Sequence, residues 1–452
     1  MITTLEQRVT EIDPLRLLGI EGMVVSVQGL SLRVRHLPLP LGSMVELDRP
    51  GRRSAMGEVV GFDDCDTVVM LYDHVDAVQP GSRVHACPNA DMVQVGPGLL
   101  GRVVDALGRP VDGGGPIQDV QWHSAVGENV PAMERAVIED PLPTGIRCID
   151  SLLTLGRGQR VGIFSGPGVG KSTLLGSITR ATAADAIVIA LVGERGREVT
   201  EFVERTLGEE GRRRSVVVVS TGDESPLRRV RATQLAMAAA ESLRDEGKHV
   251  LFCMDSLTRH AHALRQIGLA SGEHPATRGY PPSVFAQLPR LIERAGAIRG
   301  GGSITGLYTV LVEGDDLAEP VTDAALGVLD GHVILSNTLA ARGHYPAIDA
   351  LESVSRLADQ VSDANHTAAR REVLKLLSAW SDVEDLVSIG AYTKGANVQS
   401  DVAIELKPLL MEFLAQESDA PSSFPDTCRE LVRLATVGLQ MRQQLGAAGG
   451  GA

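Results

Sequence analysis

Residues 160–173 have the sequence RVGIFSGPGVGKST: an apolar run, a glycine-rich loop, and a lysine followed by two hydroxyl residues. A helical pattern opens at Ser172 and continues through LLGSITR. A strand, a glycine-rich loop and a helix in this order are the setting that a Walker A phosphate-binding loop requires. The alternative, a glycine turn that binds no nucleotide, leaves this setting unexplained. The segment therefore predicts an α/β fold with a P-loop.

The residue types in this loop match the chemistry of a nucleotide triphosphate. Glycines let backbone N–H groups turn toward phosphate oxygens, and the helix N-terminus adds partial positive charge. Lys171 can bridge the β- and γ-phosphates, and the Ser172 hydroxyl can bind Mg²⁺. The first position of the usual pattern is Ser165 instead of glycine, and Gly166 beside it supplies the flexibility. The predicted nucleotide-binding residues are Ser165, Gly166, Pro167, Gly168, Val169, Gly170, Lys171, Ser172 and Thr173.

Two acidic residues follow apolar runs downstream. Residues 249–256, HVLFCMDS, end an apolar run at Asp255, as in a Walker B element whose carboxylate holds the Mg²⁺ water shell. Residues 190–198, ALVGERGRE, place Glu194 just past another apolar run. A carboxylate at that edge of a sheet can polarise a water for attack on the γ-phosphate. We expect Glu194 to do so and Arg195 to steady charge beside it; a solvated turn is the alternative.

The rest of the chain divides into regions with different residue patterns. Short apolar runs alternate with helical patterns between about 145 and 340, which predicts a parallel sheet buried on both faces. Before them, residues 21–90 carry short β-rich runs typical of a small barrel or sandwich. The glycine-rich residues 108–116 are typical of a linker, and the pattern from 366 to 440 is helical. The last residues, 441–452, are of low complexity and predict a disordered tail.

The N-terminal segment has the spacing of a short amphipathic helix. Its apolar residues recur three and four apart, interrupted by Pro14. Packing on its own domain and docking of a partner are equally consistent with this pattern. The apolar positions are Leu5, Val9, Ile12, Leu15 and Leu18.

Composition disfavours several classes of function. The chain has 452 residues, enough for two or three domains, and a formal net charge of −14, which disfavours binding to a phosphate backbone. Aromatic residues make up only 3%, and the five scattered cysteines are typical of free thiols in a reducing compartment. Neither a secretory signal nor a bilayer-spanning apolar stretch is present in the sequence. We therefore expect a cytoplasmic protein.

Taken together, seven motifs resemble the export ATPases of type III secretion, which serve bacterial flagella and injectisomes. The family is similar to the catalytic subunits of rotary ATP synthases. The likeness runs from about residue 21 to residue 416, and LVSIGAYTKGAN at 386–397 favours the flagellar branch over the injectisome branch. The motifs are RVGIFSGPGVGKSTLLG, VGERGREV, MDSLTR, GYPPSVF, YTVLVEGDD, DGHVILS and HYPAID.

This resemblance implies a RecA-like P-loop ATPase core with an N-terminal six-stranded β-barrel and a C-terminal helical domain. By matching motifs, Glu194 is the catalytic carboxylate, with Arg195 and Arg259 near the phosphates. Tyr345 packs on adenine, Arg356 is an arginine finger given to the adjacent subunit, and Phe424 is a loose candidate for the adenine pocket. The expected divisions are a partner-binding helix at 1–20, the barrel at 21–92, the ATPase domain at 93–365, the helical domain at 366–440 and the tail at 441–452.

The same resemblance implies the cofactors and partners. The cofactors are ATP and Mg²⁺. The partners are five further copies of the chain in a homohexamer, a stator-like peripheral protein at the N-terminal helix, a coiled-coil central stalk, and export chaperones with their substrates. Such a protein would lie in the cytoplasm, peripheral to the export apparatus of the inner membrane. Three alternatives stay open: an ATP synthase subunit, a hexameric RNA helicase, which the acidic charge disfavours, and a non-catalytic nucleotide-binding subunit, which would lack Glu194 or Lys171.

Overall fold

The computed structural model describes residues 19–73, 75–87, 91–127, 129–312, 316 and 318–449, the side chains of 446–449 excepted. The predicted N-terminal helix lies almost entirely outside these residues. The chain forms two compact units: one holds the residues up to Met92 with Glu224–Val230 and His262–Val284, and the other holds the remainder. Within the described residues, no helix combines the length and the apolar character needed to cross a bilayer.

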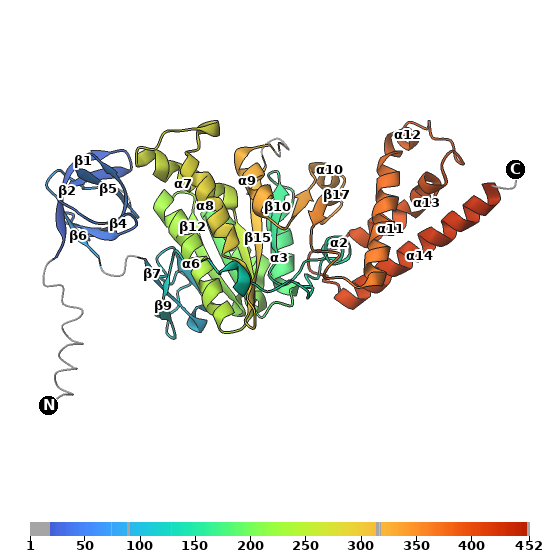
Figure 1. Ribbon diagram of the computed structural model, residues 1–452, viewed down its shortest axis with the longest axis horizontal. Helices are drawn as coiled ribbons and strands as arrows, with labels where there is room; N and C mark the ends of the chain where they lie inside the picture. Colours follow the sequence, from blue (N-terminus) through green and yellow to red (C-terminus); the bar gives the residue numbers. More distant parts are fainter. Residues whose placement is uncertain are drawn as a thin grey trace, which may run out of the picture. The chain divides into compact units, whose positions relative to one another are not determined.

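The first unit contains a closed barrel of six antiparallel strands in the order β1-β2-β5-β4-β3-β6 (Figure 1). Alternate residues point inward, so that Val24, Leu32, Val45 and Val69 form a small core. Closure confirms the barrel and excludes the sandwich. The strands are β1 (Glu21–Gln28), β2 (Ser31–Arg35), β3 (Met44–Leu47), β4 (Ala55–Asp63), β5 (Asp66–Leu71) and β6 (Arg83–Ala86).

The second unit is built on a sheet in the order β17-β16-β10-β15-β13-β11-β12-β8. All neighbours are parallel except β16 and β17, and the two-residue β14 (Gly296–Ala297) adds to β15 antiparallel. The strands are β8 (Val103–Asp105), β10 (Arg160–Ser165), β11 (Ala186–Glu194), β12 (Ser215–Thr221), β13 (His249–Asp255), β15 (Ser303–Leu311), β16 (Gly331–Leu335) and β17 (Ile348–Ser355). A separate two-stranded sheet pairs β7 (Met92–Val95) with β9 (Gln121–Ser124), and β8 lies between these two strands in the sequence.

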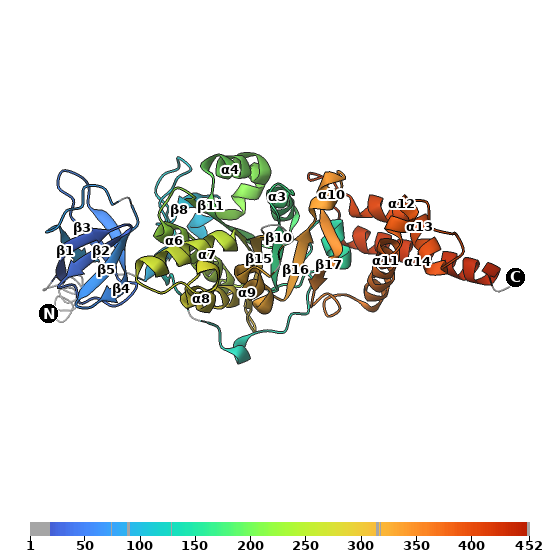
Figure 2. The ribbon, with the colours of Figure 1, turned by 90° about the horizontal axis from the view of Figure 1, so that it is seen from above.

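Helices cover both faces of this sheet, as a parallel sheet requires. Figure 2 shows α3 and α4 on one side of the strands and α8 and α9 on the other. The helices are α2 (Arg147–Leu152), α3 (Lys171–Ala181), α4 (Gly196–Glu201), α5 (Gly208–Arg213), α6 (Pro226–Asp245), α7 (Leu257–Ala270), α8 (Pro282–Glu293), α9 (Pro320–Val328) and α10 (Asn337–Ala341), with a π-helical turn at Phe202–Leu207 and short 3-10 turns at Pro97–Leu99, Ala132–Glu134 and Thr277–Gly279.

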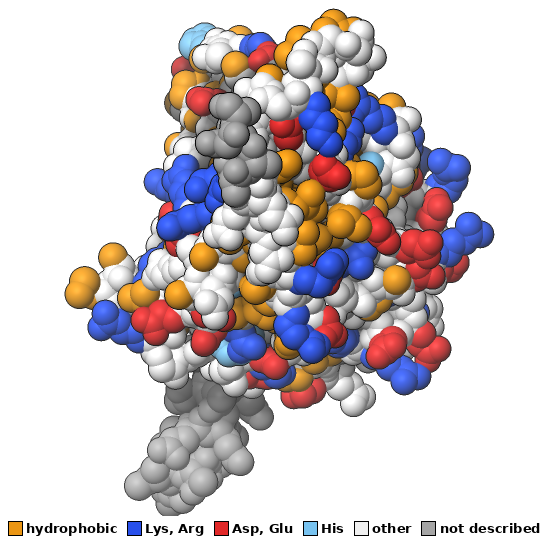
Figure 3. All heavy atoms as spheres, turned by 90° about the vertical axis from the view of Figure 1, so that its right-hand side faces the viewer, with side chains coloured by type: hydrophobic (Ala, Val, Ile, Leu, Met, Phe, Trp, Pro, Cys, Tyr) orange, Lys and Arg blue, Asp and Glu red, His pale blue; other side chains and the backbone are white. Residues whose placement is uncertain are grey.

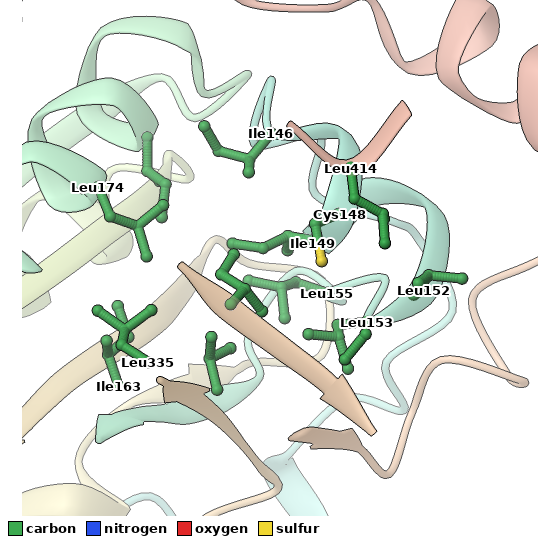
Figure 4. Packing of buried hydrophobic residues seen from close by; sticks show 14 of the residues in the cluster. Ile146, Cys148, Ile149, Leu152, Leu153, Leu155, Ile163, Leu174, Leu335 and Leu414 are labelled. Atoms are coloured by element: carbon green, nitrogen blue, oxygen red, sulfur yellow. The ribbon is translucent and has the colours of Figure 1, made fainter. Parts of the chain in front are cut away.

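Four further helices end the chain: α11 (Ala364–Ser381), α12 (Glu384–Ser388), α13 (Val398–Leu414) and α14 (Phe424–Gly449). They share one hydrophobic core with the sheet. Figure 4 shows Leu414 of α13 close to Cys148 of α2, and Ile163 beside Leu335. Because this core is continuous, the helical domain and the ATPase domain pack as one body.

The tail expected at 441–452 needs correction, because α14 runs on to Gly449. Its buried residues Leu431 and Leu434 begin a helical stripe, and Met441 and Leu445 extend this stripe against the same core. The small residues after Leu445 obscured that spacing in the sequence.

The face formed by the C-terminal helices is partly apolar. Figure 3 shows hydrophobic side chains gathered there between charged ones. Exposed apolar residues on α12, α13, α14 and the following loops include Leu386, Ile389, Leu409, Val432 and Leu439.

Candidate active site

The glycine-rich loop joins the end of β10 to the start of α3. Gly168 has φ 79° and Gly170 φ 96°, in the left-handed region that favours glycine. Gly170 is the N-cap of α3, and Lys171 and Ser172 are its first residues. The loop thus has the backbone of a phosphate cradle, with the Ser172 side chain exposed to it and that of Lys171 half-buried.

Sheet order brings the predicted charged residues together. Lys171 follows β10, Asp255 ends β13 and Glu194 ends β11, all at the carboxyl edge of the sheet. Lys171 Nζ lies 2.6 Å from Asp255 Oδ1 and 4.0 Å from Glu194 Oε1. Thr309, on the intervening strand β15, donates a hydrogen bond of 2.7 Å to Asp255 Oδ1. Sequence analysis missed Thr309, although a polar residue inside the apolar run LYTVLV was the available signal.

Glu194 is held in an environment that opposes its ionisation. Burial, and then the charge of Asp255, raise the pKa of its carboxyl group to about 7, while Lys171 and Arg259 pull in the other direction. Arg259 Nε lies 3.3 Å from Glu194 Oε1, but without the geometry of a hydrogen bond. The buried Oε1 therefore has no hydrogen-bond partner among the described residues and can accept a proton from a water.

Arg259 and Arg195 differ in where their side chains lie. Arg259 lies over the end of β11, where Gly193 makes room for it: a Cβ at Gly193 would be 2.8 Å from Arg259 Cδ. The Arg195 side chain is 77% exposed and pairs with Glu198 at 3.1 Å. Of the two arginines expected near the phosphates, the structure brings only Arg259 to Glu194.

A cavity of about 920 Å³ adjoins the phosphate loop. Its lining includes Gly170 and Leu174 from the loop and α3, Tyr345, and residues 415–419 between α13 and α14. The Tyr345 ring lies beside Gly170, 3.7 Å from where a Cβ would be. Phe424 is not among the lining residues; its ring packs against His366 with centroids 6.0 Å apart. Tyr345 is thus the aromatic residue of this cavity.

Gln416 holds the far wall of the cavity in place, which sequence analysis did not anticipate. Its Oε1 accepts from Arg147 N at 2.8 Å, and its Nε2 donates to the carbonyls of Gly145 and Ala420. Nearby, Ser418 O accepts a hydrogen bond of 2.8 Å from Ser177 on α3. The polar segment AQESDAPSS carries no motif that would reveal these contacts.

The site fits a magnesium nucleotide. Its cradle at Gly168 and Gly170 needs backbone that other residues rarely adopt, and the cavity beside it is of ligand size. Asp255 and Ser172 supply the oxygen ligands that Mg²⁺ prefers. His260, near this site, is buried and bonds to Thr233, and burial lowers its pKa to about 4. Its role is therefore structural.

Arg356 lies at the amino ends of the parallel strands, at the end of the sheet opposite to the phosphate loop. Strand β17 is antiparallel to β16, with Ile348 opposite Leu335 and Ser355 opposite Gly331. Since Leu335 pairs with Ser165 at the loop end of β10, the chain reaches Arg356 at the far end of the strands. The structure therefore does not bring Arg356 to the phosphate loop of its own chain.

The fold and this site define a P-loop ATPase with a RecA-like core. Residues 145–355 match the model of the ATP synthase alpha/beta family nucleotide-binding domain, and residues 362–433 match that of the T3SS EscN ATPase C-terminal domain. The chain is 47% identical to the flagellum-specific ATP synthase of Pseudomonas aeruginosa, over 92% of this chain and 93% of that one. It is 46% identical to the type 3 secretion system ATPase of Xanthomonas euvesicatoria, over 90% and 92%.

A solved structure agrees. The ATPase EscN of enteropathogenic E. coli, assembled and in complex with its central stalk EscO, superposes with a TM-score of 0.84 at 39% identity, over 92% of this chain and 100% of that one. The chain therefore belongs to the family of flagellum-specific ATP synthases and type III secretion ATPases, and it is an ATPase that uses ATP with Mg²⁺. The helicase and the non-catalytic subunit are excluded, and the C-terminal match separates the chain from the ATP synthase subunits.

Proposed function

We propose that this ATPase drives protein export through the flagellar type III secretion apparatus, by unloading and unfolding chaperone-bound substrates. The observation that carries its chemistry is the meeting of Lys171, Asp255 and Glu194 beside the nucleotide cavity. Flagellum-specific relatives support the flagellar branch. The Xanthomonas relative, almost equally similar, supports an injectisome as the second candidate. Deleting the gene decides between them: loss of motility with intact effector secretion supports the flagellum.

Each residue has a role that follows from its place. Lys171 binds the β- and γ-phosphates, and Asp255 and Ser172 would hold Mg²⁺, which when bound neutralises phosphate charge. Glu194 takes the proton of the attacking water, and Arg259 steadies the charge of Glu194. Tyr345 packs on adenine.

Arg356 serves the site of an adjacent subunit. Because it lies at the amino edge of its own sheet, it can meet a γ-phosphate only across a subunit boundary. An arginine supplied in this way is worth about 10³–10⁵ in rate. We therefore propose a homohexameric ring, supported by the assembled EscN structure.

Two substitutions separate binding from chemistry. Glu194→Gln keeps the shape of the side chain but cannot accept a proton, so turnover should fall roughly 10²–10⁴-fold while ATP stays bound. Lys171→Ala should weaken both binding and hydrolysis, because it removes a charge from the phosphate cradle. Fluorescent-nucleotide binding and phosphate release measure the two effects. Near-normal turnover by Glu194→Gln would remove this residue from the mechanism.

The remaining partners follow from the same family. We propose that the apolar face of the C-terminal helices meets a coiled-coil stalk and chaperone–substrate complexes; the solved complex of EscN with its central stalk EscO supports the stalk. A stator-like peripheral protein would bind residues 1–18, bringing the enzyme, in the cytoplasm, to the export apparatus.

Deleting residues 1–18 tests the stator proposal. Basal ATPase activity should persist, because no residue of the site lies in this segment, while co-purification with the peripheral export protein should be lost. Circular dichroism of the shortened chain is the control for folding. A shortened chain that misfolds would instead assign the segment to packing within its own domain.

A further inference from the structure

Asp330, directly before β16, forms hydrogen bonds with Arg160, the first residue of the strand β10 that leads into the phosphate loop. Its Oδ2 accepts hydrogen bonds of 3.0 Å from both the backbone N and the Nε of Arg160. Its Oδ1 accepts a third, of 3.2 Å, from Arg160 Nη2, and its own backbone N donates to Arg160 O at 2.8 Å. Four hydrogen bonds thus fix Asp330 to the strand that leads into the phosphate loop.

The same residue holds the backbone of Arg356. Asp330 O accepts a hydrogen bond of 3.0 Å from Arg356 N. It also accepts one from Nε2 of the fully buried Gln159, which donates as well to Ser355 Oγ at 3.0 Å. The Arg356 residue itself is exposed, and its guanidinium has no ion pair within the described part of the chain. Its backbone is therefore fixed while its charged end is free to meet another molecule.

The phosphate loop and Arg356 thus lie at opposite ends of three neighbouring strands, β10, β16 and β17. Figure 2 shows β10, β16 and β17 as neighbours, and their register places Ser165 at one end and Ser355 at the other. A shift of β10 on nucleotide binding would therefore reach the backbone of Arg356 through Asp330. Placement matters, because a group misplaced by about 1 Å can lose about 10²-fold in rate.

We propose that Asp330 is a positioning residue. Arg356 of each subunit enters the site of its neighbour, and Asp330 links the backbone of this Arg356 to the phosphate-loop strand β10 of its own subunit. This rests on the proposed role of Arg356 in the adjacent site. The state of one nucleotide site is thereby transmitted to the next site around the ring: the Asp330 carboxylate bonds Arg160 at the start of β10, and the Asp330 backbone carbonyl bonds Arg356 N.

Asp330→Asn tests this, with Asp112→Asn as a matched control. Asp112 makes the same kind of fork, accepting from Arg102 Nε at 2.8 Å and Nη2 at 2.9 Å and from Val103 N at 3.1 Å, beside β8. We expect Asp330→Asn to lower kcat by about 10–10²-fold with KM and nucleotide affinity unchanged, because Arg356 is misplaced. Asp112→Asn should leave kcat within about twofold. Equal losses of kcat in the two variants would overturn the proposal.

Mixed rings decide on which site Asp330 acts. Asp330→Asn mixed with Lys171→Ala should recover activity, since an intact phosphate loop then meets a well-placed Arg356 from its neighbour. Arg356→Ala mixed with Lys171→Ala is run in parallel. Recovery in the Arg356 mixture alone would mean that Asp330 acts on its own loop, which overturns this inference and leaves the proposed function standing. If neither mixture recovers activity, Arg356 is not supplied to an adjacent subunit, and this inference fails together with that proposal.

Two further variants guard against simple misfolding. In the Arg356→Ala background, Asp330→Asn should lower kcat no further, whereas a general structural defect would add its own loss. If Asp330→Asn does not form rings, Ser355→Ala removes the hydroxyl that accepts from Gln159 and donates to Thr154 O, and leaves Asp330 unchanged. It should give a smaller fall in kcat that mixed rings also recover, and a fall that they do not recover contradicts the proposal.

Discussion

At the carboxyl edge of the sheet, Glu194 is the residue that we propose as the general base. Burial and Asp255 raise its pKa to about 7. A general base must be ionised, and the ionised fraction grows as the pH rises through the pKa. We therefore expect kcat/KM to rise with pH through about 7, as measured by steady-state kinetics at constant ionic strength.

Glu194→Gln supplies the control for this pH profile. Its residual activity should lack the inflection near 7; an inflection that persists would belong to another group. Stability gives an independent check. Because folding raises this pKa, the carboxyl group contributes its full stability below about 4.5 and loses it as the pH rises through about 7. The glutamine variant should therefore gain in Tm over the wild type more at pH 8 than at pH 5.

Site residues were predictable where one rule placed them. Lys171, Asp255 and Glu194 each follow a buried strand, and parallel strands end at a common edge. Where a side chain points was not predictable, because it depends on local packing. Arg195 has open solvent and Glu198 beside it, whereas Arg259 fits the space that Gly193 leaves.

Among the structural elements, the chain before α2 is held to the ATPase unit by a buried ion pair. Arg294, just after α8, donates to both carboxylate oxygens of Glu241 on α6, at 2.8 and 2.7 Å, and to Ala125 O at 2.9 Å. Both charged residues are more than nine-tenths buried. The ion pair thus holds the segment after β9 against α6 and the end of α8.

Removing one partner should be costly, because it leaves the other charge buried and unpaired. Arg294→Met should lower the free energy of unfolding by about 3–5 kcal/mol, measured by denaturant titration. Arg433→Met is the matched control: it breaks the exposed pair with Glu430, which is worth about 0–1 kcal/mol. Similar losses in both variants would mean that burial does not set the cost.

Elements were predictable where periodicity was strong. The apolar runs that end at Phe164 and Asp255 predicted strands β10 and β13 within a residue or two. Strand β8 was missed because three residues carry no pattern, and β17 because a register shift breaks its alternation. The order of strands in the sheet depends on contacts far apart in sequence, which periodicity does not encode.

For the whole molecule, the proposed sharing of Arg356 between subunits would make activity depend on assembly. If each site needs Arg356 from a neighbour, specific activity should rise with protein concentration as rings form. Arg356→Ala should bind ATP through Lys171 yet hydrolyse it roughly 10³–10⁵-fold more slowly at every concentration. Phosphate release across a dilution series, with mass photometry to count subunits, measures both. Wild-type activity that is independent of concentration across ring formation would argue for a site complete in one chain.

The order of barrel, ATPase core and C-terminal helices along the chain was predictable, because each region has its own pattern of apolar residues. The sharing of one core between sheet and C-terminal helices was not, since it joins residues such as Ile163 and Leu414 that no local pattern relates.

The nucleotide cavity has a consequence for how the protein is made. Its far wall, residues 415–419, leaves the ribosome long after the phosphate loop has emerged. Domains form in order during translation, at roughly 5–20 residues per second. The nascent ATPase domain therefore lacks this wall of the cavity until the chain beyond α13 has been made. ATP can stabilise only what binds it. Cellular nucleotide thus favours the finished chain, not the truncated products of interrupted synthesis.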